Sequence, residues 1–243
     1  MSTKVPLPPH VICLFGLASL LVDSATWAGD WHQWRGPNRD NVSTEKELLD
    51  DWKTPPKLLW RAEGIGDGYA SVVVANDVCR GQNIHTPIIR DDYVFGVSAF
   101  DGKYGLLQLA RSPGGVEARE VYFEQDANLG SHVDGLLLAG EHVYVCGRIT
   151  ASIELLTGRT VWKERGPASG RSSTLYADSN LYVHDENGLM ALIRPLPTRY
   201  QLQGEFKPAG APQVRDSWAH PALSNGQLYV REQDALYCYD LKK

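Results

Sequence analysis

The stretch Ser152-Ile-Glu-Leu-Leu-Thr-Gly-Arg-Thr-Val-Trp162 decides the fold, because degraded copies of it recur along the chain. A short strand with an aromatic anchor precedes each copy: His142-Val-Tyr144-Val, Asn180-Leu-Tyr182-Val, Gln227-Leu-Tyr229-Val and, more weakly, Tyr93-Val-Phe95-Gly. The anchors lie roughly 40 to 50 residues apart, which is the period of a β-propeller built from four-stranded blades. The sequence therefore predicts an all-β propeller of four-stranded antiparallel blades.

Each repeat has the pattern of two apolar strands around a polar turn, then a third strand and a fourth, outer strand. Asp, Asn, Ser and Gly gather in the turns at residues 90–92, 140–142, 178–180 and 224–226, as hairpins require. The fourth strand carries an aromatic residue in three repeats, and we expect Phe123, Trp162 and Phe206 to hold these positions.

The two ends of the chain complete one blade. The last repeat stops at Lys243 without a fourth strand, whereas residues 57–60 look like a fourth strand with no repeat before it. Pairing them removes two open sheet edges. We therefore predict that residues 58–61 pair beside residues 235–239.

The repeat pattern breaks near its start. Residues 69–78 begin a further repeat, but His85 already opens the next one, so half a blade is missing. The chain without its leader has room for about 4–5 blades of about 45 residues each. We expect one or two blades to be missing, through a true deletion or a gene-model error at residues 78–84, which leaves Cys79 at the junction.

Residues 1–28 have the pattern of a secretory signal peptide. Lys4 precedes an apolar run at residues 11–22, and Thr26-Trp-Ala28 offers small residues for cleavage. The run is too short to cross a hydrocarbon layer of ~30 Å, so we expect a secreted or periplasmic protein with no membrane span after leader removal. The alternative is an uncleaved membrane segment.

A non-repetitive segment at residues 29–56 separates the leader from the predicted propeller domain at residues 57–243. We expect Trp31 and Trp34 to pin this segment against the propeller by packing. Residues 45–52 are expected to make one short helical turn before Pro55 and Pro56 end it.

Composition excludes some functions. With 43% apolar and 22% charged residues the chain suits a globular domain, and its net charge of −5 gives no footprint for nucleic acid. Three cysteines remain after the leader, an odd number that leaves at least one free thiol or an intermolecular bond. Cys146 and Cys238 are interpreted as small apolar residues within strands.

The quoted stretch resembles the tryptophan-docking repeat of quinoprotein-type propellers, A-x-D-x-x-T-G-K-x-x-W, through Thr157, Gly158 and Trp162. The opening Trp31-His-Gln-Trp-Arg-Gly-Pro37 and the closing blade at residues 218–240 are similar to exported bacterial PQQ-binding-like (PQQ-like) β-propeller repeat proteins, PQQ being pyrroloquinoline quinone. The resemblance implies the propeller fold, export, and a Trp that stacks on a Gly of a neighbouring blade. It does not imply a cofactor.

A quinone dehydrogenase of this class would need an aromatic floor, a Ca²⁺ site and an Asp base, and it commonly has a vicinal disulfide. This chain has no adjacent cysteines, and the acidic turns at residues 91–92 and 185–188 lack the alternating ladder of a calcium loop. We assign no catalytic and no metal-binding residue, and expect PQQ with calcium only if the chain is an enzyme.

One set of residues is a candidate for ligand binding. Its members all lie just ahead of the innermost strand of successive repeats, and such positions converge on one mouth of the central channel. They are His85, His132, Asp134, Arg171, Trp218 and His220. The alternative is that each caps its own strand or meets water in the channel.

Three functions are consistent with these features. The first is an exported, non-catalytic propeller that binds a protein or a small molecule. The second is a PQQ-dependent alcohol or polyol dehydrogenase. The third is a scaffold like the propeller lipoprotein of outer-membrane assembly, which adds peptide strands to its edges. The absence of a recognisable catalytic motif favours the first.

Overall fold

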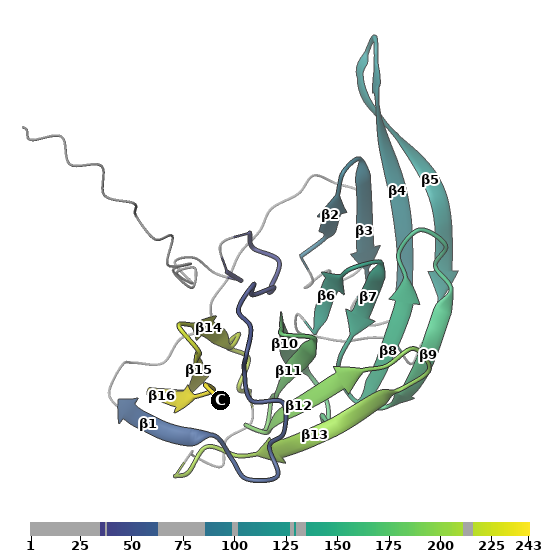
Figure 1. Cartoon of the computed structure of the whole chain (residues 1–243). Helices are drawn as coiled ribbons and strands as arrows, with labels where there is room; N and C mark the ends of the chain where they lie inside the picture. The colour runs from purple at the N-terminus through teal and green to yellow at the C-terminus, as the bar shows by residue number, and fades with distance from the viewer. Residues whose placement is uncertain are drawn as a thin grey trace, which may run out of the picture.

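The computed structural model describes residues 35–36, 38–62, 86–98, 102–126, 129, 135–210 and 216–243. Its strands form four separate sheets, each of four antiparallel strands. Figure 1 shows these sheets following one another around an arc, with the first strand of each sheet on the inner side. The chain is a β-propeller, as the repeat period predicted, with four blades in its described part.

Blades 1 and 2 each run in chain order from the inner to the outer strand. Blade 1 contains β2 (Ile88–Arg90), β3 (Tyr93–Val97), β4 (Lys103–Ser112) and β5 (Gly115–Gln125). Blade 2 contains β6 (Leu136–Ala139), β7 (His142–Val145), β8 (Ile149–Glu154) and β9 (Thr160–Arg165).

Blade 3 follows the same order, and blade 4 ends on a strand from the other end of the chain. Blade 3 contains β10 (Ser172–Ala177), β11 (Asn180–Asp185), β12 (Met190–Pro195) and β13 (Tyr200–Phe206). Blade 4 contains β14 (Ala222–Ser224), β15 (Gln227–Glu232), β16 (Ala235–Asp240) and β1 (Lys57–Ala62). None of the described residues forms a helix long and apolar enough to cross a membrane.

The N-terminal strand closes the last blade. β1 pairs antiparallel with β16, with Leu58 opposite Tyr239 and Arg61 opposite Tyr237. This confirms the pairing expected from the two incomplete repeats. The incomplete repeat at residues 69–78, the break at residues 78–84 and Cys79 lie outside the described residues.

The four repeats have one register. In every blade the aromatic anchor of the second strand pairs with an equivalent residue of the third strand. That residue pairs in turn with an equivalent residue of the fourth strand, which lies beside a β-bulge. The rows are Phe95–Leu106–Tyr122, Tyr144–Ser152–Trp162, Tyr182–Leu192–Gly204 and Tyr229–Cys238–Trp60. The anchors identified in the sequence are therefore equivalent positions.

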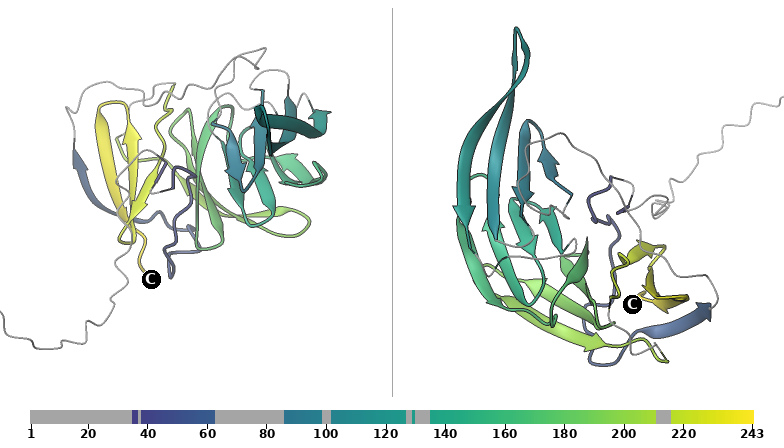
Figure 2. Two further views of the ribbon diagram at one scale, coloured as in Figure 1. Left: turned by 90° about the horizontal axis from the view of Figure 1, so that it is seen from above. Right: turned by 180° about the vertical axis from the view of Figure 1, so that it is seen from behind.

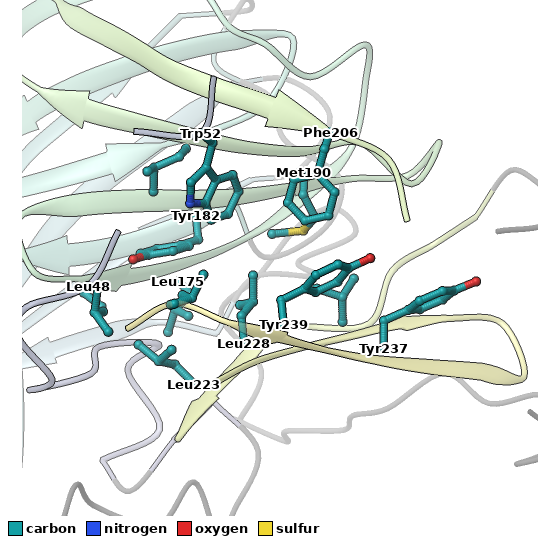
Figure 3. Packing of buried hydrophobic residues seen from close by; sticks show 14 of the residues in the cluster. Leu48, Trp52, Leu175, Tyr182, Met190, Phe206, Leu223, Leu228, Tyr237 and Tyr239 are labelled. Atoms are coloured by element: carbon teal, nitrogen blue, oxygen red, sulfur yellow. The ribbon is translucent and has the colours of Figure 1, made fainter. Parts of the chain in front are cut away.

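Three buried apolar clusters join successive blades. One lies between blades 1 and 2, around Phe95 and Ile153, and a second between blades 2 and 3, around Trp162 and Val183. The third lies between blades 3 and 4, around Tyr182 and Tyr239 (Figure 3). Each sheet thus buries apolar side chains against its neighbour, which is the layer packing that stabilises all-β folds.

Neighbouring blades are also joined by docking contacts that start from the fourth strand. The Tyr122 hydroxyl donates a hydrogen bond to the Leu155 carbonyl of blade 2 at 2.7 Å. The Trp162 Nε1 donates in the same way to the Leu196 carbonyl of blade 3 at 2.9 Å. Each acceptor lies at the turn between the third and fourth strands of the next blade.

Phe123, Trp162 and Phe206 lie in the fourth strands β5, β9 and β13, as expected. In blade 1 the docking residue is Tyr122, because the bulge beside it turns Phe123 to the opposite face, where it is 60% exposed. The docking contacts correct one expectation. Trp162 does not dock on a glycine, since it meets the turn at Leu196. Gly158 instead receives Tyr122 from the preceding blade.

The N-terminal segment supplies the missing aromatic of blade 3, where Gly204 occupies the docking position. Trp52 forms a bridge with Gly204 and donates its backbone N–H to the Gln203 carbonyl at 3.0 Å. Its indole contacts Tyr182 and Phe206 edge-on, at centroid distances of 5.5 and 5.2 Å (Figure 3). Trp52 thus packs in the apolar cluster between blades 3 and 4.

The helical turn expected at residues 45–52 is not present. Leu48 and Trp52 instead form isolated bridges with Lys242 and Gly204, and Glu47 has a left-handed φ of 59°. The backbone N–H groups of Leu49 and Trp52 donate to the carbonyls of Leu241 and Gln203, which replaces hydrogen bonds that a helix would make. The predicted anchors Trp31 and Trp34 lie outside the described residues.

Candidate functional site

The six channel-mouth candidates fall into two groups. Arg171, Trp218 and His220 are described, and they precede the first strands of blades 3 and 4. His85, His132 and Asp134 lie outside the described residues. The geometry of the site is therefore the geometry of the junction between blades 3 and 4.

Arg171 and Trp218 lie together across this junction. The guanidinium carbon of Arg171 is 5.2 Å from the centroid of the Trp218 ring, which is a cation–π distance. The Arg171 Nε is 3.9 Å from a carboxylate oxygen of Glu186, and 37% of the Arg171 side chain is exposed. A cation thus lies on an aromatic face with part of its surface open to solvent.

The turn between β11 and β12 holds this pair in place. Glu186 accepts the backbone N–H of Arg171 through its carboxylate at 3.3 Å, and its own N–H donates to the Arg171 carbonyl at 3.0 Å. The Glu186 carbonyl accepts the Ser217 N–H at 3.0 Å, next to Trp218. One residue therefore fixes the backbone on both sides of the junction.

The same turn uses its other acidic residue for local structure. Asp185 accepts the hydroxyl of Ser169 at 2.8 Å and its backbone N–H at 3.2 Å. Gly188 closes the turn with an N–H bond to the Asp185 carbonyl at 2.8 Å, in a left-handed conformation with φ of 78°. Residues 185–188 are thus a hydrogen-bonded turn, as expected from the sequence.

A buried ion pair connects blades 3 and 4 at this junction. His184 of β11 and Glu232 of β15 are 0% and 2% exposed, and the His184 Nε2 is 2.6 Å from a Glu232 carboxylate oxygen. The other ring nitrogen, Nδ1, is 3.0 Å from the Ala219 carbonyl. With two acceptors at its two nitrogens, the ring is suited to the doubly protonated imidazolium.

Opposing effects act on the pKa of His184. Burial alone would lower it, but the hydrogen bond and charge of Glu232, the Ala219 carbonyl and the charge of Asp185 raise it above its ordinary value. The pair joins blade 3 to blade 4 through charge rather than through apolar packing.

The sequence contains a feature that predicts a buried partner for His184. His184 lies two residues after the anchor Tyr182, where the first two repeats have Val97 and Cys146. The fourth repeat has Arg231 at this position. A buried titratable residue where the first two repeats have buried apolar side chains requires a buried partner. Comparison of the aligned repeats would have singled it out.

Ser217, His184 and Glu232 resemble a nucleophilic triad in residue type but not in geometry. The Ser217 hydroxyl is 3.5 Å from the His184 Nε2, the same nitrogen that contacts Glu232. A catalytic triad needs the hydroxyl and the carboxylate on different ring nitrogens. Ser217 is also buried, so these three side chains stabilise the interface.

The described cysteines are not reactive groups. Cys146 and Cys238 are both free and buried. Burial raises the pKa of the Cys146 thiol to about 12, and a neutral thiol is a poor nucleophile and metal ligand. Among the described residues, no three or more His, Cys, Asp or Glu side chains are grouped to hold a metal ion.

No family model and no curated protein matches the sequence. Solved structures with a similar backbone include BamB from Moraxella catarrhalis, at 14% identity and a TM-score of 0.46, with 65% of this chain and 43% of that chain covered. They also include a europium-containing methanol dehydrogenase, at 12% identity and a TM-score of 0.41, with 75% and 32% covered.

A third similar structure is a glutaminyl cyclase from Myxococcus xanthus, at 18% identity and a TM-score of 0.38, with 61% of this chain and 58% of that chain covered. The chain thus spans less than two thirds of the length of each of these three proteins. The assignment of the propeller fold rests on the strand pairing and register of the chain itself.

Proposed function

We propose that this chain is an exported, non-catalytic β-propeller that binds a ligand at the mouth beside blades 3 and 4. The observation that carries the proposal is the Arg171 guanidinium, which lies on the Trp218 ring and forms an ion pair with Glu186. Convergent polar and aromatic groups at a channel mouth are typical of a binding site. The leader predicted at residues 1–28 supports export to the periplasm or the medium.

The chemistry of the pair favours a ligand that presents oxygen acceptors beside a flat or apolar group. Arg171 offers planar N–H donors suited to carboxylate or carbonyl oxygens, and Trp218 offers an apolar face. Because Glu186 fixes the backbone of both segments, little ordering is required on binding. A peptide or a small carboxylate meets these requirements.

Thermal unfolding in the presence of a panel of small carboxylates and short peptides tests this proposal. At least one compound should raise the melting temperature of the purified protein, and Arg171→Gln should abolish that rise. Arg199→Gln, in the β12–β13 turn, is the matched control and should leave the rise unchanged. A rise that Arg171→Gln does not affect would place binding elsewhere.

The dehydrogenase alternative is tested separately with PQQ and Ca²⁺. We expect no stable visible spectrum of bound quinone and no reduction of an artificial electron acceptor over a panel of alcohols. Retention of the quinone together with turnover would overturn the non-catalytic assignment.

A further inference from the structure

The β4–β5 hairpin extends beyond the rest of blade 1. Its strands have 10 and 11 residues, whereas β2 and β3 have 3 and 5. Pairing between β3 and β4 ends at Tyr93 opposite Gln108. The distal part of the hairpin is therefore a two-stranded ribbon, which projects from the blade in Figures 1 and 2.

One face of this ribbon carries most of its apolar side chains, together with Arg111 and Glu120, and the other face is mainly polar. Leu109 lies opposite Ala118, and Val116 occupies the same face two residues away. Leu109 is 36% exposed and Val116 is 69% exposed. Glu117 and Arg119 lie on the opposite face of the same strand. A two-stranded ribbon with an exposed apolar face is marginally stable until something covers or extends it.

The outer edge of β5 is a regular pairing template. Every residue of β5 is exposed except Tyr122, and the bulge at Val121 limits the regular stretch to residues 115–120. The Leu109 N–H bonds to the Asp92 carbonyl at 2.7 Å, away from β5. Leu109 and Ala118 therefore form a non-hydrogen-bonded pair, and the backbone groups of Val116, Ala118 and Glu120 point to the open edge.

We propose that a second copy of this chain pairs with β5 edge to edge, antiparallel, about a two-fold axis through Ala118. In this register Ala118 opposes Ala118 of the other copy, and Val116 opposes Glu120. All the residues with outward-pointing N–H and C=O groups thus meet as hydrogen-bonded pairs. Two-fold dimers are the commonest symmetric assembly.

Charge selects this register over its neighbours. With the axis at Ala118, Glu117 of each copy opposes Arg119 of the other, and both lie on the same face. An axis at Glu117 would oppose two carboxylates, and an axis at Arg119 would oppose two guanidinium groups. Like charges directly opposite are destabilising in a sheet, and opposite charges are stabilising. The edge is therefore complementary to itself in one register.

The fold leaves room for this dimer. Antiparallel pairing directs the two propeller bodies to opposite ends of the shared ribbon, because each body lies at the Gln125 end of its own β5. The corresponding faces of the two ribbons then become continuous, with Ala118 next to its counterpart, Val116 opposite Glu120 of the other copy, and Leu109 on the outer strand β4 of each ribbon. Two marginal two-stranded ribbons become one four-stranded sheet.

Sedimentation equilibrium of the purified protein and of charge-swap variants tests the proposal. The wild-type protein should be dimeric, and Glu117→Arg and Arg119→Glu should each weaken association by at least about tenfold, because two favourable charge pairs become repulsive. The double variant should restore the wild-type dissociation constant. Glu205→Arg, at an exposed position of β13, is the control and should leave it unchanged.

Cross-linking gives a second readout. Ala118→Cys should form an intermolecular disulfide, because opposed Cα atoms in a hydrogen-bonded pair lie ~5.5 Å apart. Val116→Cys should not, since residue 116 opposes residue 120. A monomer at all concentrations, a dimer insensitive to the charge swaps, or a monomer that instead captures an extended peptide at this edge would each overturn the proposal.

Discussion

The ring of Tyr122 in blade 1 lies directly on Gly158 in blade 2. A β-carbon placed on Gly158 would lie 2.7 and 2.8 Å from two carbons of the Tyr122 ring. Gly158 also has a φ of 72°, which disfavours any side chain. The glycine is thus required both by its backbone conformation and by the aromatic ring that docks on it.

Gly158→Ala should therefore lower the free energy of unfolding by roughly 2–4 kcal/mol, through left-handed strain together with steric overlap. Gly140→Ala is the matched control, because Gly140 has a φ of 60° and open space around it. It should cost only the strain, about 1–2 kcal/mol. Urea unfolding measures both, and equal losses would mean that the contact with Tyr122 is unimportant.

The N-terminal segment should detach when Gly204 gains a side chain. A β-carbon there would overlap the backbone and Cβ of Trp52, so Gly204→Ala is expected to release residues 41–52 from blade 3. Limited proteolysis should then cut this segment in the variant but not in the wild-type protein. Trp52→Ala should give the same cleavage and lose about 3–5 kcal/mol of stability. Unchanged protection in both variants would contradict the packing role of Trp52.

The buried His184–Glu232 pair predicts a pH-dependent stability. Because the folded state raises the pKa of His184 above 6.5, the pair stabilises the fold fully below that pH. This stability is lost as the pH rises through the folded-state pKa. Glu232→Gln should thus destabilise the protein by about 3–5 kcal/mol at about pH 6 and by less at about pH 9.

Chemical unfolding at several pH values measures this effect, with His184→Gln as the control that removes the titrating group. The difference between wild type and His184→Gln should shrink as the pH rises. A difference that grows with pH would mean that His184 is neutral in the folded protein.

The sequence predicted the blade register because period and anchor residues carry it. Local sequence patterning identifies equivalent anchor positions at Tyr144, Tyr182 and Tyr229. The strand that begins at residue 57 belongs to no complete repeat, and the last repeat lacks a fourth strand, so the two could be paired. The docking residues were harder to predict from the sequence. A single bulge residue, Val121, exchanges the faces of Tyr122 and Phe123, and sequence alone does not reveal where an extra residue is inserted.

Other features depend on contacts between distant segments. Trp52 substitutes for an aromatic that blade 3 lacks, and the cue was Gly204 at a position where other repeats have Tyr or Trp. Of the mouth candidates, Arg171 and Trp218 come together, as convergence on one mouth requires, although their role in binding stays a prediction. His184 was missed because it was treated alone rather than against its equivalents in the other repeats.

The completion of blade 4 by the N-terminal strand is tested most directly by a disulfide between β1 and β16. Lys57 lies opposite Asp240, so cysteines at both positions should form an intramolecular bond, which peptide mapping by mass spectrometry would identify. The pair Lys57→Cys with Lys242→Cys lies out of register and should not form one. Free thiols at positions 57 and 240 under oxidising conditions would contradict the shared last blade.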